Sequence, residues 1–469
     1  MLLPVIISFL VRLVRIAMSN LFLRNLNREY PVISSGKGVW LTDKSNRQYL
    51  DGCSGAVVSN IGHAVPEIID AINTQLSKVE FAHTSQFISE PALELSERLI
   101  NMAPARFQAS GLVYFVSGGS EAVETALKLA RAYFYECGLY QKRIVISRWG
   151  SYHGSTQGAL SATGHPARRK PYLPVLSDNP HIAASHPYRC ACGADICQSQ
   201  ECGKKQAAEL DDAIKKCGAE NVMAFIAEPV VGAALGAVVP HPGYFKQIRE
   251  ICNRHNILFI ADEVMTGLGR IGEDFGISAF GVEPDIIALG KGLSAGYMPL
   301  GAVLASAEVS AIFSKGSGVF EHGFTYSGHL VACAAGLAVL QYMDKHNLLE
   351  RVRVLEPLLQ ETLNSLRDCE IVGDVRGRGF LWGIELVCER QSKKPFAPDL
   401  RVSQKIAAEA SKLGLLIYPG SGSIDGVKGD HFIVAPPFVI TEAELETLGT
   451  CLKQAVRKIA QSVPSTSRI

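Results

Sequence analysis

Short apolar runs alternate with segments of helical periodicity along the chain up to about residue 330. The runs predict buried strands at 112–116, 143–147, 222–227, 257–261, 286–289 and 302–305. Several of the intervening segments repeat apolar residues at helical spacing, which predicts amphipathic helices. Buried strands that alternate with such helices are typical of an α/β domain whose mostly parallel sheet is covered on both faces.

The pattern changes after about residue 330. A long Ala-rich helix is predicted first, then a charged helix over 349–367, short strands at 380–388 and 431–435, and a last helix. Thr441 and Glu444 have the spacing of a capping box at the start of that helix. We therefore expect a second, smaller α+β domain at the C-terminus.

These patterns predict four parts of the chain. We expect an N-terminal extension over 1–17, an N-terminal segment over 18–64 that packs with the small domain, a large domain over 65–330 and the small domain over 331–469. The N-terminal segment includes a predicted hairpin over 40–51.

The N-terminal extension is apolar but contains Arg12 and Arg15, and no acidic residue precedes Glu29. A membrane-spanning helix needs ~20 apolar residues without such charges, so we expect no membrane anchor. A cytoplasmic location is expected. A mitochondrial presequence is the alternative, because such segments contain arginine and lack acid, and a plain upstream extension is also open.

Composition narrows the class of protein further. The 469 residues include 46 basic and 45 acidic side chains without a long basic block, which argues against nucleic-acid binding. Twelve scattered cysteines suit the reduced thiols of an intracellular enzyme.

Four cysteines lie close together in 187–218, which we interpret as an insertion-like loop. Their spacing, C-x-C-x4-C-x4-C, does not match the paired C-x2-C steps of common zinc sites. Reduced loop thiols are therefore expected and a bound metal is the alternative, for Cys190, Cys192, Cys197 and Cys202.

Two predicted strands are followed by side chains that can carry chemistry. Asp262 follows 257–261, and Lys291 follows 286–289 among glycine and serine residues. Ligands of α/β sheets bind beyond these strand ends. A lysine that forms an imine with an aldehyde and a carboxylate that keeps a pyridine nitrogen protonated are what a pyridoxal-phosphate site requires. Asp262 could instead be a turn residue and Lys291 a solvated lysine, but the apolar surroundings of Lys291 disfavour the latter.

Other strand ends carry further candidates. Gly119 and Ser120 begin the helix after the first strand, where free N–H groups suit a phosphate, although such turns also join strand to helix for steric reasons. Tyr152 could stack on an aromatic ring or be an ordinary half-buried tyrosine. Glu228 could bind near the ligand or anchor a loop, and Thr325 could bind a phosphate or cap the Ala-rich helix.

Seven blocks of the sequence, over roughly 21–460, resemble the class III (subgroup II) pyridoxal-phosphate-dependent aminotransferases, in that family's order. The blocks are SGGSEAVETALKLAR, YHGST, AEPV, DEVMTGLGRIG, LGKGLSAGYMPLGAV, FTYSGHLVACAAGLA and APPFVIT. The resemblance implies fold type I, an α/β large domain with a smaller α+β C-terminal domain, and pyridoxal 5'-phosphate as the cofactor.

The resemblance also implies a role for each candidate. Lys291 would be the catalytic Schiff-base lysine and Asp262 the partner of the pyridine nitrogen. Thr325 would bind the phosphate across a dimer interface, which implies a homodimer with shared active sites. The other expected cofactor-binding residues are Gly119, Ser120, Tyr152, Glu228 and Val264. No metal is expected at this site.

Two positions depart from the family pattern. Met265 stands where many members have Gln, and Ile433 stands where members that act on α-carboxylates often have Arg. A bidentate clamp for a substrate carboxylate is missing there, although Lys428 or an arginine from elsewhere could replace it.

The expected activity is amino-group transfer to a small 2-oxo acid, with a β- or ω-amino acid or a plain amine favoured as the donor. An aminomutase or decarboxylase of the same family would keep the same residues. An inactive metal-binding or scaffolding relative is the alternative from another class.

Overall fold

A computed structural model describes residues 20–194 and 196–463 of the chain. The predicted extension over 1–17 lies outside the described residues. No helix within these two ranges is long and apolar enough to cross a membrane. In those ranges no disulfide joins any of the twelve cysteines.

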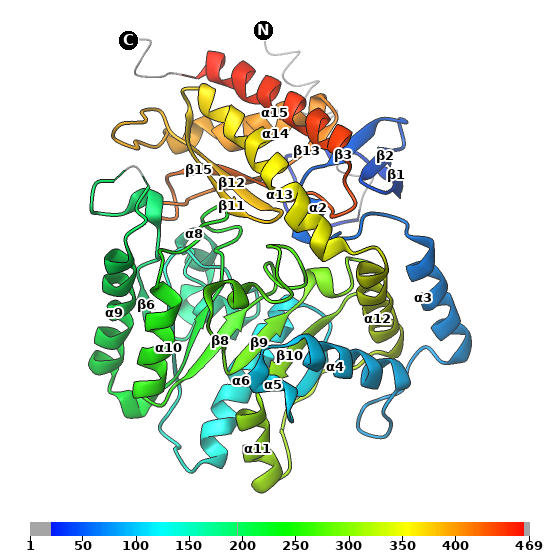
Figure 1. Ribbon diagram of the computed structural model, residues 1–469, viewed down its shortest axis with the longest axis vertical. Helices are drawn as coiled ribbons and strands as arrows, with labels where there is room; N and C mark the ends of the chain where they lie inside the picture. The colour runs from blue at the N-terminus through cyan, green and yellow to red at the C-terminus, as the bar shows by residue number, and fades with distance from the viewer. Residues whose placement is uncertain (1–19, 195, 464–469) are drawn as a thin grey trace.

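A seven-stranded sheet forms the centre of the large domain (Figure 1). Its order is β4 (Leu112–Val116), β10 (Gly301–Ala305), β9 (Ile286–Leu289), β8 (Leu258–Asp262), β7 (Val222–Ala227), β5 (Ile144–Arg148) and β6 (His181–Ile182). Neighbours from β9 to β6 are parallel, whereas β10 runs antiparallel to both β4 and β9. The predicted mostly parallel sheet is confirmed.

Alternate side chains of the central strands pack into two separate cores. Ile226 and Ile260 face the core that contains the buried side of α6 (Gly119–Glu136). Phe225 and Phe259 face the opposite core, with α10 (Tyr244–Arg254). Burial on both faces explains why these strands are apolar throughout rather than alternating.

A group of helices flanks the β4 side of the sheet. They are α3 (Pro66–Lys78), α4 (Glu90–Met102), α5 (Ala105–Gln108), α11 (Ala307–Lys315) and α12 (Leu330–Lys345). The Ala-rich α12 packs against α3 and α4, and α13 (Leu348–Asn364) then leads to the small domain (Figure 1). The domain boundaries expected at residues 65 and 330 stay predictions.

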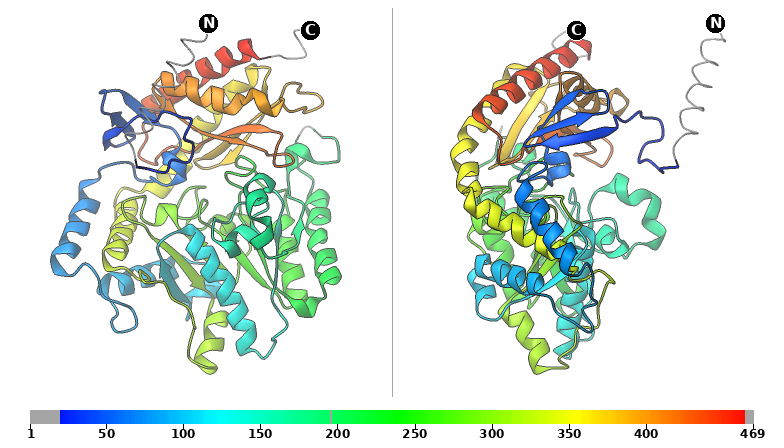
Figure 2. Two further views of the ribbon diagram at one scale, coloured as in Figure 1. Left: turned by 180° about the vertical axis from the view of Figure 1, so that it is seen from behind. Right: turned by 90° about the vertical axis from the view of Figure 1, so that its right-hand side faces the viewer.

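Two four-stranded sheets make up the smaller part of the molecule. One has the order β1 (Ile33–Lys37), β2 (Trp40–Asp43), β3 (Gln48–Asp51) and β13 (Leu415–Leu416). The other has the order β11 (Val372–Arg378), β12 (Leu381–Leu386), β15 (Asp430–Val434) and β14 (Tyr418–Ser421). Strand β3 pairs with β13, so N-terminal and C-terminal segments lie side by side (Figure 2).

Two long helices, α14 (Val402–Lys412) and α15 (Glu442–Ser462), pack against each other over these sheets. The predicted capping box at the start of α15 is present. The Thr441 hydroxyl accepts from the Glu444 N–H at 3.3 Å, and the Glu444 carboxylate accepts from the Thr441 N–H at 2.8 Å.

The prediction of an insertion-like loop over 187–218 is wrong for the second half of that range. Residues there form the helix α9 (Gln200–Cys217), whose N-cap Ser199 accepts from the Cys202 N–H at 3.3 Å. Ala207, Leu210 and Ile214 form its buried stripe. The stripe is narrow and the surrounding residues are charged, which hid the helical periodicity.

Short helical segments complete the chain. They are α2 (Ser54–Val57), α7 (Gln157–Ala162), α8 (Pro166–Arg169), and the 3-10 turns η1 (Lys170–Val175), η2 (Pro187–Arg189), η3 (Ala219–Asn221), η4 (Gly276–Phe280), η5 (Lys291–Leu293), η6 (Ser365–Asp368) and η7 (Pro398–Leu400).

Candidate active site

The parallel pairing of β8 and β9 brings Asp262 and Lys291 to the same edge of the large sheet. Asp262 is in register with Ala288, and Lys291 begins the turn η5 just beyond β9. Lys291 has φ 44°, a left-handed conformation that costs a non-glycine residue about 1–3 kcal/mol and is found preferentially at functional sites. Burial lowers the pKa of its amine to about 8, although the carboxylates of Asp262 and Glu228 act in the opposite direction.

The carboxylate of Asp262 is held in place by two hydrogen bonds. Its Oδ2 lies 2.7 Å from Nδ1 of His153, and its Oδ1 accepts from the Val264 N–H at 3.1 Å. The side chains of Asp262 and His153 are buried, and the backbone N–H of His153 donates to the hydroxyl of Thr163 at 2.9 Å. Nε2 of His153 is buried and has no partner in the described part of the chain. Asp262 therefore has one defined orientation.

The N-terminus of α6 packs closely against the lysine loop. A Cβ on Gly119 would lie 2.7 Å from Cγ1 of Val264, and a Cβ on Gly290 would lie 3.2 Å from the backbone of Gly119. Glycine at these positions lets three chain segments approach each other. The Ser120 hydroxyl accepts from the Ser155 N–H at 3.0 Å, which joins α6 to the segment after β5.

Glu228 fastens two loops beside this edge. Its Oε1 accepts from the Tyr152 N–H at 3.1 Å and its Oε2 accepts from the Gly232 N–H at 2.8 Å. Burial raises the pKa of this carboxyl. Of the two roles considered for Glu228, loop anchoring is therefore present in the structure.

A cavity of about 450 Å³ lies next to Tyr152. Arg24 and Arg168 line it, and the guanidinium of Arg168 lies 4.3 Å from the centroid of the Tyr152 ring. The tyrosine hydroxyl lies 3.0 Å from the Ser155 hydroxyl. Positive charge and an aromatic face thus border this cavity.

Thr325 is separate from this group within one chain. It lies on an exposed turn before α12, next to the exposed ring of Tyr326. The residues that the structure does gather, directly or through shared partners, are Lys291, Asp262, Gly119, Ser120, Tyr152, Glu228 and Val264.

Comparison with known proteins identifies the family to which this chain belongs. The family model described as Aminotransferase class-III matches residues 24–456. A curated relative, the uncharacterized aminotransferase YodT of Bacillus subtilis, is 41% identical over 93% of this chain and 97% of its own length. The chain belongs to the class III aminotransferases. The family resemblance predicted from the sequence is confirmed.

Other relatives of this aminotransferase carry more specific names. Gamma aminobutyrate transaminase 2 of Solanum lycopersicum is 36% identical over 92% of this chain and 93% of its own length. An (S)-enantioselective omega-transaminase from Thermomicrobium roseum has a TM-score of 0.88 at 35% identity, covering 96% of this chain and 98% of that one. An omega transaminase from Pseudomonas jessenii, solved in complex with PMP, has a TM-score of 0.88 at 32% identity, covering 96% of this chain and 98% of that one. The predicted fold class is confirmed.

The two departures from the family pattern lie in one apolar cluster of this aminotransferase. Ile433 is fully buried there together with Val230, and Met265 packs against them. A Cβ on Gly232 would lie 2.1 Å from the sulfur of Met265. Lys428, considered as a replacement cation, lies on an exposed turn with its amine 3.9 Å from the Asp425 carboxylate.

Sequence reasoning missed two residues that support the site. His153 orients Asp262, and its only signal was its position beside Tyr152. Arg270 is fully buried and donates to the carbonyls of Phe380 and Pro436 at 3.1 and 2.7 Å and to Asn60 Oδ1 at 2.7 Å. Burial lowers the pKa of its guanidinium to about 9. Arg270 thereby ties the N-terminal segment to the small domain.

Proposed function

We propose that this aminotransferase binds pyridoxal 5'-phosphate between Lys291 and Asp262 and transfers amino groups with it. The observation that carries the proposal is a lysine of lowered pKa and an oriented, buried carboxylate at one sheet edge, against a helix N-terminus. The residues fit the cofactor. At the start of α6, near Gly119, backbone N–H groups without a side-chain cap are available to bind a phosphate. The solved relatives include one in complex with PMP.

Each side chain has a task that follows from its chemistry. When bound, pyridoxal phosphate supplies an electron-accepting ring that stabilises negative charge on the substrate carbon. Lys291 would hold the cofactor and move the proton at the carbon that bears the amino group. Asp262 would keep the ring nitrogen protonated, Tyr152 and Val264 would enclose the ring, and Ser120 would donate to the phosphate.

For the substrates, we propose a β- or ω-amino acid or an amine as donor and a small 2-oxo acid as acceptor. Ile433 and Met265 offer no polar group in their cluster. Relatives named for gamma aminobutyrate and as omega-transaminases support the same class. Arg168 lines the cavity beside Tyr152, and no carboxylate in the described ranges forms an ion pair with it. Arg168 would therefore bind a substrate carboxylate from the tyrosine side.

A donor panel against pyruvate and 2-oxoglutarate tests this proposal. β- or ω-Amino acids or amines should give the highest kcat/KM, and Lys291→Ala should abolish turnover and shift the cofactor's absorbance to that of its free aldehyde. If α-amino acids are the best donors, the substrate assignment fails. If Lys291→Ala still turns over at the wild-type rate, the mechanistic assignment fails. Product analysis identifies an aminomutase or a decarboxylase, which would release a rearranged or shortened donor.

Arg168 gives a sharper version of the same test. Arg168→Ala should raise KM about tenfold or more for carboxylate-bearing donors and leave KM for a simple amine unchanged, because only the former lose a charge-assisted bond. Arg168→Lys keeps the charge and should recover part of the loss. An equal rise of KM for both donor types would mean that Arg168 only supports the Tyr152 ring.

We also propose a homodimer that shares its active sites through Thr325. The turn that carries Thr325 borders a cavity of about 260 Å³ whose rim includes the exposed side chains of Phe87, Ile88 and Leu93. Leu112 and Tyr326, the sequence neighbours of the lining residues Val113 and Ser327, are exposed as well. Contiguous exposed apolar surface of this kind is typical of a protein–protein interface, and a second copy of the chain would cover it.

The expected cytoplasmic location is also a proposal, with a mitochondrial one as the alternative. The absence of disulfides within the described ranges is compatible with either compartment. Imaging of the full chain with a C-terminal fluorescent fusion, with and without residues 1–17, distinguishes the two.

A further inference from the structure

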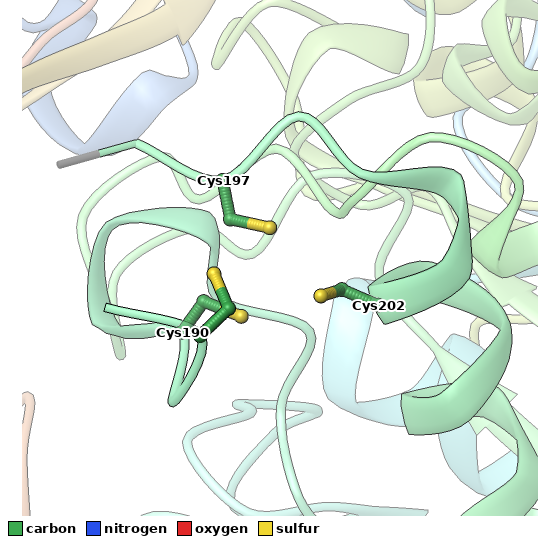
Figure 3. A group of neighbouring side chains, drawn as sticks. Cys190, Cys197 and Cys202 are labelled. Atoms are coloured by element: carbon green, nitrogen blue, oxygen red, sulfur yellow. The ribbon is translucent and has the colours of Figure 1, made fainter. Parts of the chain in front are cut away.

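The loop between β6 and α9 brings four cysteine side chains to one point. Their sulfur atoms all lie within 4.8 Å of one another. Figure 3 shows Cys190, Cys197 and Cys202 directed into a common space, with Cys202 coming from the first turn of α9. The linear spacing left this convergence as the less favoured alternative, because it matches no common zinc pattern and the fourth sulfur is supplied by a helix and not by the loop.

Ordinary packing does not account for the cluster. Thiols that serve as small apolar groups are buried in a core, as Cys252 and Cys333 are. Of the clustered thiols only Cys197 is buried; Cys192 is exposed and the other two are partly exposed. No disulfide pairs any of them in the described chain.

The arrangement has the size of a single tetrahedral metal site. Zn–S bonds of about 2.3 Å place the four sulfurs of such a site about 3.8 Å apart, so spacings within 4.8 Å require only a small contraction. We propose that the chain binds one structural Zn²⁺ ion through four thiolates, those of Cys190, Cys192, Cys197 and Cys202. Four protein ligands fill the coordination sphere, so the ion has a structural and not a catalytic role.

The backbone already holds the ligands in position. The Cys197 N–H donates to the Pro187 carbonyl at 3.1 Å, which closes the loop across the first two ligands. The Ser199 hydroxyl caps α9 by accepting from the Cys202 N–H at 3.3 Å, which orients the fourth ligand. A metal bound here would order a connection between two elements of the large domain.

This loop also contacts the small domain. Arg189, just before the first ligand, donates to Oε1 of Glu385 in β12 at 2.7 Å. Lys393 donates to the Ala194 carbonyl at 3.0 Å. Glu385 in turn pairs with Arg376 at 2.6 Å, and Arg376 donates to the Gly236 carbonyl at 2.8 Å. The ion would therefore fasten the loop against the small domain, near the segment that follows Glu228, without contacting the proposed cofactor site.

Metal content of the full-length holoenzyme, purified without chelators, tests the proposal. Plasma mass spectrometry should find about one zinc per chain in the wild type. Cys192→Ser and Cys202→Ser should each lose most of it. Cys137→Ser, which removes an exposed cysteine outside the cluster, should retain it. Absence of zinc in the wild type, iron in its place, or zinc retained in both cluster variants would overturn the assignment.

Two measurements on the wild-type chain keep the test independent of variant folding. Replacement of the metal by Co²⁺ should give intense thiolate charge-transfer absorption and the visible bands of a tetrahedral ion. Release of zinc by a chelator should make about four further thiols reactive per chain and lower the unfolding temperature. A disulfide between any two of the four cysteines, detected by mass spectrometry, would refute the site.

Discussion

At the scale of single residues, the orientation of Asp262 depends on His153. Removal of a buried hydrogen bond to a charged group costs about 1.5–3 kcal/mol, which corresponds to about ten- to hundredfold in rate. We therefore expect His153→Ala to lower kcat/KM by that factor and to weaken cofactor binding, while His153→Asn, which keeps a donor, recovers part of the loss. Steady-state kinetics and cofactor titration measure both effects.

The matched control for His153 is His255, a histidine outside the site. Its Nε2 lies 2.5 Å from Oδ1 of Asp211. His255→Ala should leave kcat/KM unchanged. Equal losses in both variants would assign His153 to general stability and not to positioning Asp262.

The lowered pKa of Lys291 predicts a pH dependence of cofactor capture. Only the neutral amine attacks an aldehyde, and the neutral fraction grows as the pH rises through the pKa, here about 8. The rate at which the cofactor-free protein takes up pyridoxal phosphate should therefore rise up to about pH 8 and then level off. An ordinary lysine would level off only above about pH 10. Stopped-flow absorbance across this range makes the measurement.

Asp262→Asn is the informative variant for that experiment. The Asp262 carboxylate raises the pKa of the lysine against the effect of burial, so its removal should move the midpoint to lower pH. A rate that still increases at about pH 9.5 in the wild type would contradict the lowered pKa.

Lys291 and Asp262 could be predicted from the sequence because each follows a short apolar strand, and parallel strands place their ends at one edge. His153 could not, because its partner Asp262 lies 109 positions away and the contact depends on how β5 and β8 are placed in the sheet. Arg270 lies in the sequence block DEVMTGLGRIG, but its role could not be predicted because the carbonyls that it binds, those of Phe380 and Pro436, belong to the small domain.

At the scale of elements, the start of α6 depends on a close contact between Gly119 and Val264. A methyl group on Gly119 would lie 2.7 Å from Val264, and such overpacking costs about 1–3 kcal/mol. We expect Gly119→Ala to shift the helix N-terminus and weaken pyridoxal-phosphate affinity about tenfold or more, with the overall helix content unchanged. Equilibrium dialysis and circular dichroism provide the two readouts.

Val264→Ala distinguishes this clash from a general loss of the turn. Val264→Ala removes Cγ1 and Cγ2 of the valine, the atoms that the alanine Cβ of Gly119→Ala would contact. The double variant should therefore bind the cofactor more tightly than Gly119→Ala alone, with a coupling of about 1 kcal/mol. Strictly additive losses would contradict a direct contact between helix and loop.

Elements with a strong local signal were predictable, and those specified by their surroundings were not. The capping box at Thr441 and the apolar strands are encoded within a few residues. The helix α9 was missed because its buried stripe is narrow and lies among charged residues. The antiparallel direction of β10 carries no local signal at all, since an apolar strand buried on both faces reads the same in either direction.

At the scale of the whole molecule, the α/β class follows from the alternation of strands and helices. The pairing of β3 with β13 does not, because it joins segments from opposite ends of the chain through a short strand. The position of Thr325 relative to the site cannot be predicted from one chain either. Within one chain it is exposed and separate from Lys291, so its proposed role depends on a second chain.

Subunit mixing tests that role. Lys291→Ala and Thr325→Asp should each be inactive alone, the second because a carboxylate repels the phosphate. In a mixed dimer one site would combine the intact lysine of one chain with the intact threonine of the other. Random pairing makes half of the dimers mixed, so co-expression should restore about a quarter of wild-type activity. Lys291→Ala mixed with Asp262→Asn is the control, because both groups come from the same chain and no intact site can form. A Thr325→Asp mixture as inactive as this control would show that the active sites are not shared through Thr325.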